Sequence, residues 1–185
     1  DTSGLVLARD AQLAIEQRKY DQVKIITNKL VSKFADSRAA KLGQAIRQNY
    51  FATCMHLARR LTDCGQLTQA RELLHKLQQV CIAKQDLDYR HDISLPMIAS
   101  EFAYINYIET GDPDWQSFWG AIQGGRKSNF READVDESRI QKSCSNNLRH
   151  LAVAFHLAGE TKRARLFIDG ALQEAEKTPD VNGLS

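Results

Sequence analysis

The sequence predicts an all-α protein built from four helix hairpins, and three observations lead to this prediction. Nearly every segment places its apolar residues at helical spacing, and no convincing stretch alternates as a strand does. Only 10 Gly and 3 Pro occur in 185 residues, which disfavours a loop-rich sandwich or barrel. The tight turns at Arg18, Gly65, Gly111 and Gly159 are separated by 47, 46 and 48 residues. Such regular spacing indicates a repeated helix–turn–helix unit.

The first hairpin is expected at about residues 4–34. Its apolar side chains form two helical stripes, one within residues 5–17 and one within residues 20–34. Arg18 and Lys19 separate the stripes and mark the turn between the two helices.

The second hairpin is expected at about residues 37–84. Asp36 and Ser37 are typical of a helix N-cap and place the start of a long first helix. Gly65 is typical of the residue after a helix and places its end. Apolar residues at helical spacing over residues 67–81 then predict the second helix.

The third hairpin is expected at about residues 94–123. Ser94 is the expected cap of its first helix, and Pro96 falls in the first turn, where proline is tolerated. Trp115 and Trp119 lie four residues apart on one face of a shorter second helix. We interpret them as an aromatic core. The alternative is an exposed ridge that anchors a partner.

The fourth hairpin is expected at about residues 136–178, with Gly159 in its turn and Pro179 at its end. The four hairpins together are expected to form a single domain over residues 1–185. Because the sequence starts at Asp1 rather than Met, and the helical pattern starts almost at once, we expect this domain to be part of a longer protein.

The composition argues against several classes of function. With 25 Lys+Arg against 23 Asp+Glu, the formal net charge of +2 gives no electrostatic reason to expect binding to nucleic acid. No apolar run approaches the ~20 residues of a membrane span, so no membrane insertion is expected. No nucleophile elbow, Walker loop or dinucleotide fingerprint occurs. We therefore expect neither enzymatic activity nor a cofactor.

The four cysteines, Cys54, Cys64, Cys81 and Cys144, form no CxxC pair, and no His pair has zinc-finger spacing. A metal site is therefore not expected. Cys54 and Cys81 are expected to face each other across the second hairpin as neighbouring reduced thiols, with a disulfide as the alternative. With no sign of secretion in the sequence, this predicts a cytoplasmic location.

Two of the hairpins resemble tetratricopeptide repeats (TPR). That family places a small residue in the first helix, a Gly in the turn and an Ala five residues after the Gly. This chain has the pattern twice, in Ala58, Gly65 and Ala70 and in Ala152, Gly159 and Ala164. The repeat of about 47 residues is longer than the family's 34, and long first helices and two long loops hold the surplus. The resemblance implies a right-handed superhelical array, or α-solenoid.

The resemblance also implies a binding groove. In the TPR family, the first helices of successive hairpins line a concave groove that holds a peptide or a partner's helix. Carried over by position, the groove residues of this chain would be Met55, Arg59, Thr62, Ile98, Glu101, Ile105, Asn146, Arg149, Val153 and His156. Arg59 and Arg149 are expected to serve partner binding rather than folding.

Two functional hypotheses follow from this. The first is a protein–protein interaction scaffold whose groove binds a peptide or a partner helix. The alternative is a regulatory, output or dimerisation module of a larger signalling or transcription-regulating protein, for which a homodimer is possible. Both assign the protein a protein or peptide partner, and they differ in what surrounds this segment in the full-length chain.

Overall fold

The computed structural model describes residues 2–39, 44–83, 91–118, 120 and 148–176. These ranges contain helices and no strand, which confirms the predicted all-α class for this part of the chain. The helices are α1 (Thr2–Glu16), α2 (Tyr20–Ala39), α3 (Gln44–Asp63), α4 (Leu67–Ala83), α5 (His91–Thr110) and α8 (Thr161–Glu176), together with helical stretches 115–118 and 148–157. The chain divides into two compact units, unit 1 (Asp1–Ile105) and unit 2 (Asn106–Ser185).

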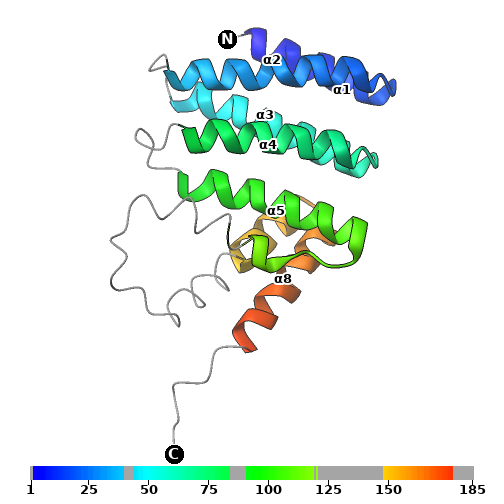
Figure 1. Ribbon diagram of the computed structural model, residues 1–185, viewed down its shortest axis with the longest axis vertical. Coiled ribbons are helices and arrows are strands. Elements are labelled where there is room, and N and C mark those ends of the chain that lie inside the picture. The colour runs from blue at the N-terminus through cyan, green and yellow to red at the C-terminus, as the bar shows by residue number, and fades with distance from the viewer. Residues whose placement is uncertain (1, 40–43, 84–90, 119, 121–147, 177–185) are drawn as a thin grey trace, which may run out of the picture. The chain divides into compact units, whose positions relative to one another are not determined.

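The first four helices of unit 1 pack in two layers. Helix α1 packs against α2, and α3 packs against α4, so each pair forms a hairpin. Helix α1 also contacts α3, and α2 contacts both α3 and α4. Figure 1 shows α2 and α4 side by side, with α1 and α3 behind them. Each hairpin therefore lies against the next with its first helix on the first helix and its second on the second.

The α3–α4 hairpin encloses several fully buried side chains of the core of unit 1. Its fully buried side chains come from one stripe on each helix, as the helical periodicity predicts. They include Cys54, Ala58, Ala70, Leu74, Leu77 and Cys81, each 0% exposed. Ala58 and Ala70 are the two small residues of the repeat pattern, and their size allows close approach of the helices.

Ala70→Leu is expected to lower the free energy of unfolding by about 1–3 kcal/mol, because the added carbons overpack a site with no exposed surface. Urea titration followed by circular dichroism measures the change. Ala52→Leu is the matched control, since Ala52 lies exposed on α3. Equal stability of the two variants would contradict the crossing of α3 and α4 at Ala70.

The predicted turns lie where the sequence places them. Gly65, Gly111 and Gly159 have φ angles of 75°, 78° and 77°, a backbone conformation that glycine adopts without strain. Arg18 stands at the corresponding position of the first hairpin and has the same left-handed conformation, with φ 56°. Each of three turns is closed by a backbone bond of 2.8 Å: Lys19 N–H to Ala14 O, Gln66 N–H to Leu61 O and Glu160 N–H to Phe155 O.

Two predicted helix starts are wrong. Helix α2 continues to Ala39, so Asp36 and Ser37 lie inside its last turn instead of capping the next helix. Helix α5 begins at His91, three residues before the expected cap at Ser94. Asp and Ser disfavour a helix interior by well under about 1 kcal/mol each, so packing of the neighbouring turns overrides this preference.

Unit 2 contains a short capped helix where the sequence predicts one. Asp114 precedes the helical stretch 115–118, and its Oδ1 accepts a hydrogen bond of 3.1 Å from the Ser117 backbone N–H. The side-chain and backbone hydrogen bonds of Ser117 hold the pKa of the Asp114 carboxyl below its ordinary value. Asp114 is therefore the N-cap of this helix.

The core of unit 2 contains a cluster of aromatic rings, and Trp115 belongs to it, as the sequence predicts. The Phe167 ring is fully buried on α8 and lies 5.5 Å from Trp115, 6.2 Å from Phe118 and 5.4 Å from Phe155, between ring centroids. Gly170, one turn further on, allows this contact, because a Cβ there would lie 2.5 Å from the Trp115 ring. Trp119 lies outside the described residues.

Candidate functional site

Five of the expected groove residues lie in the interior. Met55 and Thr62 of α3 are 2% and 3% exposed, and Glu101 and Ile105 of α5 are fully buried. Thr62 donates its hydroxyl hydrogen to the Ala58 carbonyl oxygen, 3.0 Å away, and so satisfies its polar group within its own helix. Ile98 is fully buried as well. A buried side chain does not touch a partner while the fold is closed, so these residues do not form a binding surface.

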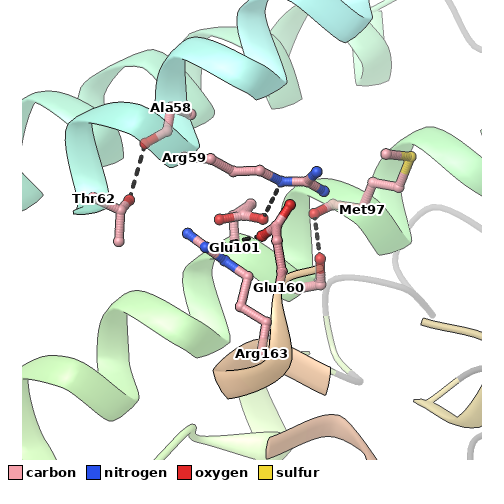
Figure 2. Close-up of polar contacts among 8 residues, drawn as sticks. Ala58, Arg59, Thr62, Met97, Glu101, Glu160 and Arg163 are labelled. Atoms are coloured by element: carbon pink, nitrogen blue, oxygen red, sulfur yellow. Dashed lines mark hydrogen bonds and ion pairs between the residues drawn. The ribbon is translucent and has the colours of Figure 1, made fainter. Parts of the chain in front are cut away.

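Arg59, also expected in the groove, forms an ion pair within unit 1. Its Nε–H donates to Glu101 Oε1 over 2.7 Å and joins α3 to α5 (Figure 2). The Arg59 side chain is 21% exposed, whereas the Glu101 side chain is fully enclosed. A carboxylate buried this deeply requires a charged hydrogen-bond donor, so Arg59 has a role in the fold. The expectation that Arg59 serves binding rather than folding therefore needs correction.

The remaining expected residues are Asn146, Arg149, Val153 and His156, of which the last three belong to the helical stretch 148–157. Asn146 lies outside the described residues. Arg149 and His156 are exposed, and Val153 between them is 53% exposed. Their spacing of i, i+4 and i+7 places all three on one face of the helix.

Leu157 extends this face. It follows Val153 by four residues and is 81% exposed. The opposite side of the helix holds the buried residues Leu148, Ala152 and Phe155, which fix its orientation in unit 2. We call the exposed surface of Arg149, Val153, His156 and Leu157 the 149–157 face. Its mixture of apolar, cationic and imidazole groups suits contact with an amphipathic peptide or helix.

A second site, a cleft between the α1–α2 and α3–α4 turns of unit 1, has no counterpart among the residues predicted from the sequence. It has a volume of about 460 Å³, and its lining includes Arg18 and Tyr20 from the first hairpin and Arg60 and Gln66 from the second. We call it the turn cleft. One sequence signal could have pointed to it: the first hairpin has an arginine where the other three have a turn glycine.

The two buried cysteines are free thiols, as expected. Cys54 and Cys81 are both 0% exposed, and Cys64 is an exposed free thiol. Burial, and next the charge of Cys81, raise the pKa of the Cys54 thiol from 9.0 to about 12. The effect of Cys81 on this pKa is consistent with neighbouring positions in the α3–α4 core. Cys144 lies outside the described residues.

The described residues hold neither a metal-binding cluster nor a membrane-spanning helix. No group of three or more His, Cys, Asp or Glu side chains in these ranges is placed to hold a metal ion. Among the helices described here, none is both long and apolar enough to cross a bilayer.

No similar protein assigns a role to the 149–157 face or to the turn cleft. The chain was compared with models of protein families, with curated proteins and with solved structures, and no match was found in any of the three.

Proposed function

We propose that this protein is a protein–protein interaction scaffold that binds a peptide or a partner's helix. The observation that carries the proposal is the 149–157 face. Val153 and Leu157 are 53% and 81% exposed on one side of a helix whose other side is anchored in the core of unit 2. Adjacent exposed apolar side chains between polar ones are a common feature of protein interaction sites.

The repeat pattern supports the same proposal. In unit 1 the first helices of two hairpins contact each other, and so do the second helices. Stacking of this kind is what a TPR-like array requires, and we propose that the chain is a divergent array of this type. An α-solenoid of stacked hairpins presents an extended surface to peptides and helices.

Site-specific photocrosslinking tests the proposal. A photoreactive amino acid at position 153 is expected to trap a partner protein in cells of the source organism, because its side chain would lie in the contact. The same amino acid at position 162 is the matched control, since Lys162 is exposed on α8 and lies outside the 149–157 face.

Each outcome is informative. A crosslinked species at position 153 that is absent at position 162, and that weakens with Arg149→Glu, supports the scaffold. A crosslink from position 153 to a second copy of the chain supports the dimerisation module instead. No crosslink at position 153, or the same crosslinks at both positions, would rule out this face as the binding surface.

A further inference from the structure

The turn cleft brings together polar side chains from the two hairpins of unit 1. The α1–α2 turn and the α3–α4 turn lie at the same end of the unit (Figure 1). The cleft between them holds about 460 Å³, within the roughly 300–1,000 Å³ that small-molecule sites occupy. Its lining carries two arginines, Arg18 and Arg60, and one acid, Glu16. The side chains therefore leave one positive charge in excess.

Arg60 carries a hydrogen-bond donor that its surroundings do not use. Its Nε atom is buried, and no acceptor for it exists among the described residues. Buried polar groups in folded proteins nearly always have a partner, and an unpaired donor on a charged group is especially costly. Arg60 also lines the turn cleft, and an acceptor there satisfies this donor once the guanidinium turns toward it, because the Nε atom has almost no accessible surface in the present position.

Arg18 is held in a conformation that arginine rarely adopts. Its φ of 56° is left-handed, whereas the corresponding positions of the other hairpins are glycines. Within the described part of the chain, the Arg18 guanidinium has no hydrogen-bonded or ion-pair partner. Strained backbone of this type is concentrated at functional sites. An arginine at this position adds a cation to the cleft at the expense of backbone strain.

The helix dipoles at the turn cleft favour neither an anion nor a cation. Helices α1 and α3 end there, while α2 and α4 begin there, so negative and positive dipole ends meet. In the last turns of α1 and α3, turn hydrogen bonds also engage carbonyl oxygens, those of Ala14, Ile15, Leu61 and Thr62. The charge preference therefore comes from the side chains.

We propose that the turn cleft binds an oxyanion, a carboxylate or phosphate group, between the guanidinium groups of Arg18 and Arg60. A guanidinium fork matches the geometry of both groups and can hold either through two parallel hydrogen bonds. The Tyr20 hydroxyl and the Gln66 amide line the same cleft and provide further donors. The site uses residues of unit 1 alone and does not depend on the function proposed above.

Isothermal titration calorimetry with the full chain tests the proposal. The probes are inorganic phosphate, succinate and a blocked tri-glutamate peptide, each at millimolar concentration and constant ionic strength. Binding of phosphate or succinate would identify a site for small free oxyanions. Binding of the peptide alone would identify a site for acidic side chains of a peptide.

Two variants locate the site. Arg60→Gln and Arg18→Gly are each expected to weaken binding about tenfold or more, because each removes one of the two cations. Lys29→Gln is the control, since it removes the same charge from an exposed position of α2 outside the cleft. Arg18→Gly should also raise the Tm by about 2–4 °C, because glycine relieves the left-handed strain. Its loss of binding then cannot result from unfolding.

Two results would overturn the proposal. One is an absence of binding for all three probes to the unmodified chain. The other is a failure of the variants to locate the site, either because Arg18→Gly keeps full affinity or because Lys29→Gln loses as much affinity as the two cleft variants.

Discussion

Replacing Arg59 with Met is expected to lower the free energy of unfolding by about 3 kcal/mol. The change leaves the fully enclosed Glu101 carboxylate without the Nε–H donor that now lies 2.7 Å from it. Removal of one partner from a buried ion pair typically costs about 3–5 kcal/mol, and the partial exposure of Arg59 places the expected loss at the lower end. Urea unfolding monitored by circular dichroism measures it.

Two further variants isolate the role of the ion pair. Arg149→Met is the matched control, because Arg149 is an exposed arginine, and a change within about 0.5 kcal/mol is expected there. The double variant Arg59→Met/Glu101→Leu should recover much of the loss, since it removes the buried charge together with its donor. If Arg59→Met unfolds at the same urea concentration as the unmodified chain, the ion pair contributes nothing to the fold.

Phe167→Ala is expected to lower the free energy of unfolding by about 3–5 kcal/mol. The ring is fully buried, and three other aromatic rings have centroids within 6.2 Å of its own. Truncation to alanine removes the central member of this cluster and leaves a cavity in unit 2. The near-ultraviolet circular dichroism signal should weaken together with the stability.

Leu172→Ala provides the comparison on the same helix. Leu172 is 58% exposed on α8, so its truncation removes little buried surface and should change stability by less than about 1 kcal/mol. Similar losses for Phe167→Ala and Leu172→Ala would mean that the aromatic cluster does not form the core of unit 2.

The features that follow from local chemistry could be predicted from the sequence. The helical period predicts the all-α class, since it reports directly which face of each helix is apolar. Gly65, Gly111 and Gly159 predict turns, because a left-handed residue at a helix end favours glycine, and all three have positive φ. The small side chain of Ala70 predicts close helix packing, and it is fully buried.

The features that depend on distant residues could not be predicted. Arg59 and Arg149 look alike in the sequence, as cations on first helices. Only the placement of Glu101, 42 residues further along the chain, makes Arg59 part of the fold. Met55 has the position of a groove residue in the resembled family, but its burial is decided by neighbouring helices. The turn cleft is of the same kind, because Arg18 and Arg60 meet only when two hairpins stack.

The buried thiols of the α3–α4 hairpin have a kinetic consequence. Alkylating reagents react with the thiolate, and at neutral pH almost none of the Cys54 thiol is ionised, since its pKa is about 12. In the unfolded chain the same thiol ionises near 9.0, so the fold loses stability as the pH rises from about 9 towards 12. Exposed Cys64 can react while the hairpin stays closed, whereas Cys54 and Cys81 must wait until α3 and α4 separate. The alkylation rates of Cys54 and Cys81 therefore report how often the α3–α4 hairpin opens. The alkylation rate of exposed Cys64 reports the reactivity of the reagent itself.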